Sequence, residues 1–518
     1  MGGRFGHGLL VSTGVLVFGV ATSPCADPVS FVYPDPSRTI VVVKAEPCEG
    51  ELPCGRALPE TDPLAAAILS ELRDPYHQSM LTVSQALRNL IGDTAGPNVI
   101  YASENEGGFA RAGLVIKGGD GSLREYPNLA YVDLVLSPER VAAGELDIYS
   151  HELGHVMMGL VWDNRSGGWS PKQHVSMGVT DGFTAINEGW GIHFQQLAMD
   201  HVPRYRDLLR ANQGHKKGSR WLWHSHLDTR LRLFSVQFND YIHRKVLPEV
   251  DTVGMTPAEL ILLEHTSPLF DPCRLRNAQE MMASEGVIAT LFYRITTDTV
   301  LQNSYAPAEF YRQFLRENPP ASMNPQEIFT PLENELIKSA FCWYSMKDHV
   351  DSLDTPFTEY VKERCRLFPA DREELLTLVV ATTAGRTVTE DLVPVYERMA
   401  YLGTVGRYAE YKQLSREYDS LLAEITSEVI GGTRAIDANL GPQLWVENSG
   451  FQIPIYVFFP EPTYPLWIDL NTAGYFDLVT FAGVTPEIAR RILAARDRSG
   501  HFASMKAAEA AGFPASPR

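Results

Sequence analysis

Residues 147–159 read Asp-Ile-Tyr-Ser-His-Glu-Leu-Gly-His-Val-Met-Met-Gly. Within this stretch His151, Glu152 and His155 follow the order H-E-x-x-H. Residues four positions apart lie on one face of a helix, so both imidazoles can reach a single metal ion. Two imidazoles and one carboxylate suit zinc, with a fourth position left for water. The other side chains from 148 to 157 are uncharged, as a buried zinc helix requires.

A third protein ligand is expected downstream, and Glu188 within the stretch 184–199 is the main candidate. Apolar residues recur there at helical spacing, which predicts a second amphipathic helix with Glu188 in its first turns. Gly189 and Gly191 are poor helix formers, each costing about 1 kcal/mol relative to Ala. We therefore expect this helix to approach another helix closely. The competing ligand candidates are Asp163, His174, Asp181 and His193.

The motif at 151–155, followed by Asn187-Glu188, resembles the gluzincins, the clan that includes thermolysin and the bacterial-type aminopeptidases. The resemblance covers about residues 95–300 and implies a zincin-like fold. It implies that His151, His155 and Glu188 bind zinc and that Glu152 is the general base. The metzincin pattern does not fit, because its Gly and His positions hold Met158 and Val161.

One position departs from the thermolysin-like chains of this clan. Those chains place an Asp four residues after the ligand Glu, where it supports a ligand histidine. Ile192 occupies that position here. In this chain a different residue must therefore support the ligand histidine.

The ligand set predicts a hydrolytic mechanism with one zinc ion per chain. Zinc lowers the pKa of a bound water towards ~7, and Glu152 would take its proton during attack on a peptide carbonyl. The carbonyl oxygen then needs a second donor besides zinc. The Tyr and His candidates for that donor are Tyr205, His224, His226, Tyr241 and Tyr293. The expected activity is therefore a zinc metallopeptidase that acts on peptides or proteins.

The pattern of apolar residues predicts an α+β fold. Runs at 99–102, 114–117 and 129–136 are typical of strands, and Ser137-Pro138-Glu139 is a helix start signal. We expect one zincin-like domain over residues 27–440. It comprises a strand-rich lobe to about 136, the zinc helices at 145–200 and a mainly helical lobe to about 440.

Within the helical lobe, apolar residues three and four positions apart predict helices at 389–399 and 408–427. Pro394 lies inside the first of these segments and must occupy a first turn or a kink. Residues 441–467 are rich in proline and aromatic residues, which predicts a connector.

Residues 468–518 are expected to form a small all-α domain. The opening Asp469-Leu-Asn-Thr-Ala473, the hairpin glycine Gly483 and the Gly-x-Phe at 500–502 resemble helix-hairpin-helix domains of the type found in competence DNA receptors. In DNA-binding members, two hairpin glycines let backbone N–H groups approach a phosphate. Gly483 and Thr485 hold those positions here, and Pro486 removes one N–H donor.

Electrostatics disfavours DNA as the partner of this domain. Its six Lys and Arg residues stand against five Asp and Glu, although Arg490, Arg491, Arg496 and Arg498 can form a local basic edge. The whole chain carries a net charge of −18, which repels phosphates. A structural or protein-binding role is favoured over DNA binding. The alternative function for the chain is an extracellular binding protein that uses this domain on a non-catalytic zincin scaffold.

Residues 1–26 predict a secretory signal peptide. Arg4 gives a positive start, 9–20 form a short apolar core and small residues lead to Ala26. The protein is therefore expected to be secreted or periplasmic. No later apolar run reaches the length of a membrane span, so no internal span is expected.

The cysteines suit an oxidising compartment. Cys48 and Cys54 bracket a short loop and are expected to be bridged. Cys342 and Cys365 are a second candidate pair, with Cys273 as a competitor for either. No C-x-x-C spacing points to a cysteine metal site.

Overall fold

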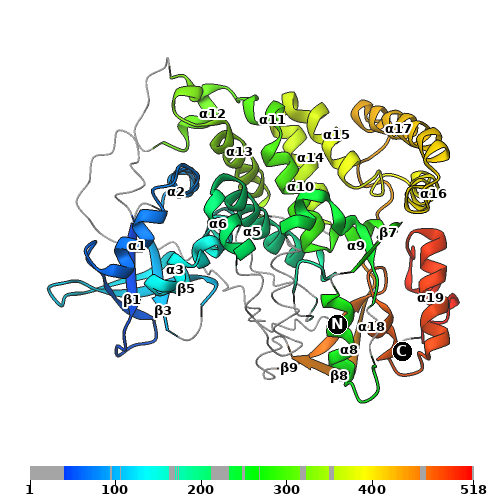
Figure 1. The fold of residues 1–518 in the computed structure, drawn as a ribbon, viewed down its shortest axis with the longest axis horizontal. Coiled ribbons are helices and arrows are strands. Elements are labelled where there is room, and N and C mark those ends of the chain that lie inside the picture. Colours follow the sequence, from blue (N-terminus) through cyan, green and yellow to red (C-terminus); the bar gives the residue numbers. More distant parts are fainter. Residues whose placement is uncertain are drawn as a thin grey trace. The chain divides into compact units, whose positions relative to one another are not determined.

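The computed structural model describes residues 40–93, 96–104, 107–162, 170, 172, 174–211, 233–247, 251–267, 269–315, 323–348, 355–454 and 463–515 (Figure 1). The signal peptide expected at 1–26 lies outside these residues. The chain forms two compact units. Unit 1 comprises residues 1–167, 193–215 and 296–351, and unit 2 comprises 168–192, 216–295 and 352–518.

Unit 1 contains a five-stranded barrel. Its strands are β1 (Ile40–Ala45), β2 (Cys54–Ala57), β3 (Asn98–Ser103), β4 (Phe109–Lys117) and β5 (Leu123–Val135). They close in the order β1-β2-β4-β5-β3. The pairs β1–β2 and β4–β5 are antiparallel, whereas β1–β3, β2–β4 and β3–β5 are parallel. The three strands expected from the sequence are confirmed as β3, β4 and β5.

The helices of unit 1 cover this barrel and one another. They are α1 (Pro63–Glu71), α2 (Pro75–Leu90), α3 (Pro138–Ala142), α4 (Ile148–Val161), α6 (Pro203–Ala211), α11 (Thr299–Asn303), α12 (Ala308–Arg312) and α13 (Pro331–Met346). The helix α4 packs against β5, α2 and α13, which accounts for its almost complete burial. Arg88 of α2 is buried and donates to the carbonyls of Gly96 and Ala130, which ties α2 to the barrel.

The helix α5 (Gly182–His201) is continuous, with residues 182–192 in unit 2 and 193–201 in unit 1. Other helices of unit 2 include α8 (Pro257–Thr266), α9 (Ala278–Met282), α10 (Glu285–Thr297), α14 (Pro356–Leu367), α15 (Arg372–Thr382), α16 (Leu392–Thr404), α17 (Tyr408–Gly431), α18 (Tyr475–Val479), α19 (Pro486–Ser499) and α20 (Met505–Ala510). Both helices predicted near 389–427 are confirmed, and Pro394 lies in the first turn of α16.

Unit 2 also contains two antiparallel strand pairs. One is formed by β6 (His243–Lys245) and β7 (Phe270–Leu275), the other by β8 (Trp445–Pro454) and β9 (Thr463–Asp469). The connector expected at 441–467 therefore contains a hairpin sheet. Pro465 is accommodated because a two-stranded sheet has only edge strands, where a missing N–H costs little.

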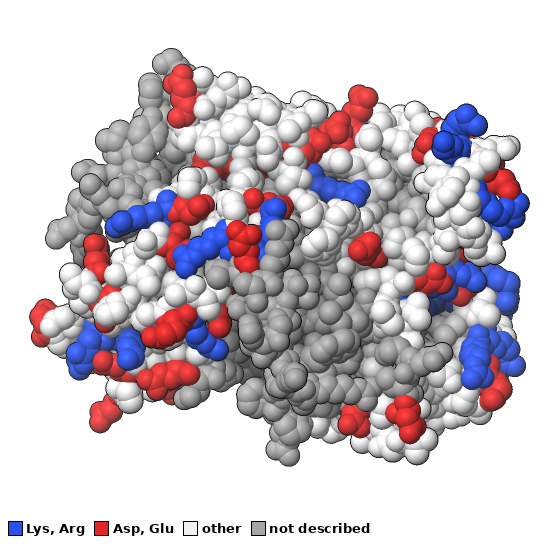
Figure 2. Space-filling view, viewed as in Figure 1, with Lys and Arg blue, Asp and Glu red and all other residues white. Residues whose placement is uncertain are grey.

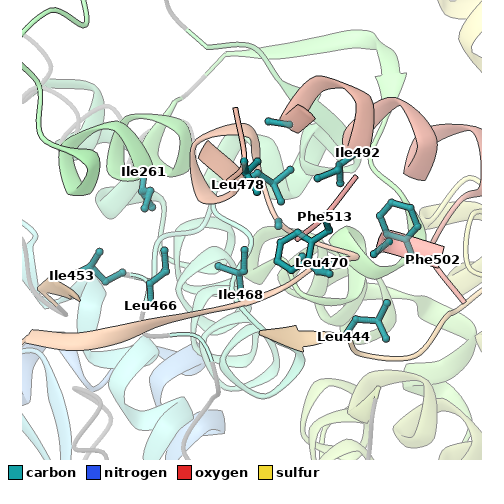
Figure 3. Close-up of a cluster of buried hydrophobic side chains, with 14 residues drawn as sticks. Ile261, Leu444, Ile453, Leu466, Ile468, Leu470, Leu478, Ile492, Phe502 and Phe513 are labelled. Atoms are coloured by element: carbon teal, nitrogen blue, oxygen red, sulfur yellow. The ribbon is translucent and has the colours of Figure 1, made fainter. Parts of the chain in front are cut away.

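The C-terminal helices share one hydrophobic core with this hairpin and with α8 (Figure 3). Leu466 and Ile468 of β9 pack with Leu478 of α18, Ile492 of α19 and Ile261 of α8. All five side chains are at most 5% exposed. The described residues from 468 onwards thus lie in the same compact unit as α8.

Buried polar contacts also attach α18 to the rest of unit 2. Lys172 Nζ lies 2.9 Å from Asp477 Oδ2, and both side chains are under 7% exposed. The Glu264 carboxylate accepts N–H bonds of 2.8 Å from Tyr475 and Phe476 at the start of α18. Burial, together with the charge of Asp477, raises the pKa of Glu264 to about 7. The first turn of α18 is therefore held by a carboxylate of the chain itself.

The cysteine predictions are confirmed in one case and wrong in the other. Cys48 and Cys54 form a disulfide between β1 and β2. The structure has no disulfide between Cys342 and Cys365, nor between Cys273 and either of them. Cys342 is buried in α13, where its thiol donates to the carbonyl of Lys338. None of the helices described is both long and apolar enough to cross a bilayer.

Candidate metal centre

The helix α4 presents both histidines of the motif on one face. His151, Glu152 and His155 are 6%, 5% and 9% exposed. The Nε2 atoms of His151 and His155 lie 3.0 Å apart. A tetrahedral zinc ion with bonds of about 2.0–2.1 Å would separate two nitrogen ligands by about 3.3 Å. The two imidazoles therefore converge with nearly the spacing that a shared zinc ion requires.

The helix α5 carries the candidate third ligand. Asp181 caps its start by accepting N–H bonds from Phe183 and Thr184. Further along, Gln195 Nε2 donates to Asp147 Oδ2 next to the first turn of α4, at 2.8 Å. Glu188 is 4% exposed. His151 and His155 belong to unit 1, and Glu188 belongs to the part of α5 that lies in unit 2.

Gly189, the residue after Glu188, lies where α5 meets α10. A Cβ at this position would lie 2.8 Å from Cγ2 of Ile288 and 3.0 Å from the backbone nitrogen of Ala289. Contacts that short force the neighbouring helix to move. The close helix approach expected from the sequence is confirmed at Gly189, and it fixes Glu188 against the start of α10.

A second group of ligand-type side chains involves Glu188. His174 Nδ1 lies 3.6 Å from Glu188 Oε2 and 3.7 Å from Glu285 Oε1. Ligand atoms of these three residues also lie within 4.8 Å of one another. The sequence pattern indicated His174 as a competing ligand but did not indicate Glu285. Glu285 precedes a mostly apolar helical segment, and a carboxylate in that position is a candidate ligand because buried carboxylates need a partner.

The other competing ligands have different roles or places. Asp181 is the cap of α5, and burial raises its pKa. His193 is fully buried, with its ring 4.3 Å from that of Phe194. Asp163 lies outside the described residues. Among the described residues, neither Asp181 nor His193 joins a group of metal-ligand atoms.

Most of the Tyr and His candidates for stabilising the substrate carbonyl oxygen are buried or lie outside the described residues. Tyr205 is 1% exposed and its hydroxyl lies 3.0 Å from His77 Nε2. Tyr241 is fully buried, with its ring against Gly286. Tyr293 is half-buried on α10. His224 and His226 lie outside the described residues.

The hairpin residues near the C-terminus adopt the geometry that the sequence suggested. Gly483 has φ +81°, a conformation that favours glycine. Thr485 caps α19 by accepting from the N–H of Ile488, and Pro486 is the first residue of the helix. The side chain of Thr485 thus bonds an N–H that a phosphate would otherwise meet.

The basic edge of this region is smaller than its sequence suggests. Arg496 is 3% exposed; its guanidinium donates to the carbonyls of Leu470 and Ala473 and pairs with Glu280 at 2.7 Å. Figure 2 shows basic side chains beside α19 with acidic ones among them. Arg490, Arg491 and Arg498 remain exposed.

One family model matches the chain. The helix-hairpin-helix motif matches residues 467–508, which confirms that part of the sequence-based assignment. No curated protein and no solved structure matches the chain. The C-terminal segment of this α/β protein therefore contains a helix-hairpin-helix motif.

Proposed function

We propose that the chain is a zinc-dependent peptidase. The observation that carries this proposal is the convergence of two imidazole nitrogens 3.0 Å apart on one buried helix. Buried imidazoles paired with a carboxylate are the donor set of hydrolytic zinc sites. His151, His155 and Glu188 would hold the ion.

Glu152 is the proposed general base. When bound, zinc would supply a water whose pKa is lowered towards ~7. Glu152 follows His151 directly and is 5% exposed, so its carboxylate is shielded from competing solvent. It would take the proton of the attacking water and pass it to the leaving amine.

The start of β4 offers a place for an extended peptide. A Cβ at Gly108 would lie 4.0 Å from Glu152 Oε1, so this backbone runs beside the proposed base. Among the described strands, β2 pairs with β4 only at 115–117, which leaves one edge of 109–112 without a strand. A substrate main chain can add to such an edge through backbone hydrogen bonds.

A peptide-library digest tests this function directly. The full-length protein should cleave peptides, and a chelator should abolish cleavage. Glu152→Gln should keep its zinc but lose about 10²–10⁴-fold in turnover, because only the base is removed. Glu145→Gln, at a side chain 47% exposed, is the matched control and should stay active. Full turnover in Glu152→Gln would show that another group is the base.

We infer an extracytoplasmic location, secreted or periplasmic. The positive and apolar segment at 1–26 supports it, as does the Cys48–Cys54 disulfide, because disulfides persist in oxidising compartments. Placing a fluorescent tag after the C-terminus and fractionating cells would test the location.

For the helix-hairpin-helix segment we propose an internal structural role over DNA binding. Glu264 accepts from two N–H groups at the start of α18, and Arg496 bonds to Glu280 and to two carbonyls. These contacts anchor the segment to the rest of unit 2. Binding of DNA or of a protein partner remains the alternative that the motif supports.

A further inference from the structure

We propose that His174, Glu188 and Glu285 form a second cation site, which shares Glu188 with the zinc site. This inference rests on the proposed function for the role of Glu188 in the first site. The three residues come from the segment before α5, from α5 and from the first position of α10. All three belong to unit 2.

The fold holds these residues in a fixed frame. Gly189 lets α5 and α10 touch, which sets Glu188 beside Glu285. The segment that carries His174 is tied to the same helices by backbone bonds. The N–H of Gly286 donates to Ser176 O at 3.1 Å, and the N–H of Thr180 donates to Ala283 O at 2.8 Å. A site built from such anchored groups is preorganised for an ion.

The charges of this group suit a cation. The side chains of Glu188 and Glu285 are only 5% and 2% exposed, and both face the same imidazole. A divalent ion bound between them would offset the cost of burying both carboxylates.

The donor set also suits a divalent metal. One imidazole nitrogen and two carboxylate oxygens are ligands that zinc and manganese accept. The His174 side chain is 31% exposed, so solvent can complete the coordination. A carboxylate has two oxygens, and in two-metal sites the ions lie about 3.5–4 Å apart. Glu188 can therefore face one ion with each oxygen.

The second site has a clear consequence for the reaction. A peptide carbonyl under attack needs a second positive group beside the zinc ion. Tyr205 and Tyr241, two of the candidates for that group, are buried. A cation held by His174 and Glu285 beside the shared ligand Glu188 is the group that we assign to this role.

Zinc stoichiometry tests the proposal. The full-length protein is stripped with a chelator, dialysed against zinc alone and assayed by elemental analysis. The parent protein should hold two ions per chain. Glu285→Gln should lose one ion, and His151→Ala should lose the other. Glu417→Gln, an exposed change on α17, is the matched control and should keep both. Circular dichroism checks folding, and His174→Asn replaces Glu285→Gln if that variant unfolds.

The outcomes separate this proposal from the proposed function. One ion in the parent, kept in Glu285→Gln and lost in His151→Ala, contradicts the second site and supports the first. One ion that is lost in Glu285→Gln but kept in His151→Ala supports the second site and contradicts the zinc peptidase. Binding of no zinc by the parent overturns both.

Discussion

Gly189 is the residue on which the meeting of α5 and α10 depends. An added methyl group would lie 2.8 Å from Ile288 and 3.0 Å from the backbone of Ala289, and backbone cannot rotate away. Gly189→Ala should therefore destabilise the protein by about 1–3 kcal/mol, although Ala is the better helix former. Denaturant unfolding followed by circular dichroism measures this change.

A matched control lies in another helix. Gly431 ends α17, and no atom lies within 4 Å of the position of its Cβ. Gly431→Ala should leave stability unchanged or raise it by up to about 1 kcal/mol. Equal effects of the two substitutions would mean that α10 does not press on Gly189.

The elements that carry the motif were predictable, because local patterns specify them. H-E-x-x-H with uncharged flanks defines α4, and the apolar spacing around Glu188 defines α5. The closed barrel was not predictable. It depends on parallel pairing of β1 with β3 and of β2 with β4. These strands are far apart in the sequence, and no short-range pattern specifies which of them pair.

Long-range packing also explains why Glu285 and the packing of the stretch 441–467 were not predicted from the sequence. Glu285 joins His174 only because α5 and α10 pack together, which is a tertiary event. The proline-rich stretch at 441–467 suggested a connector, but its strands pair and bury Leu466 and Ile468 against α18 and α19. A high proline content indicates that N–H donors are missing, but it does not indicate whether the neighbouring side chains are buried.

The attachment of α18 through the Lys172–Asp477 pair can be tested by substitution. Asp477→Asn keeps the size of the side chain but removes the carboxylate that pairs with Lys172, and leaves Glu264 as a negative group near that lysine. Breaking a buried pair costs up to about 3–5 kcal/mol. Thermal unfolding should shift to lower temperature. Asp497→Asn, whose partner Arg244 is 29% exposed, is the control and should cost less. Equal melting temperatures for Asp477→Asn and the parent would mean that the C-terminal helices are not anchored through this pair.

At the scale of the whole molecule, charge governs the choice of partner. The net charge of −18 opposes approach to DNA, and Arg496 is buried. The full-length protein should bind duplex DNA weakly at physiological salt, with a shallow salt dependence, because few phosphates can be neutralised. Fluorescence anisotropy at several salt concentrations measures this. Submicromolar, strongly salt-dependent binding would favour the DNA-binding alternative.

The account as a whole depends on the proposal that His151, His155 and Glu188 bind zinc. The most direct measurement is the zinc content of Glu188→Ala after dialysis, compared with the parent and with Asp163→Ala. Glu188 is the proposed third ligand and is only 4% exposed, so its removal should lower zinc content severely. Asp163→Ala should match the parent. Unchanged zinc content in Glu188→Ala would contradict the assignment of the third ligand, and with it the proposed peptidase.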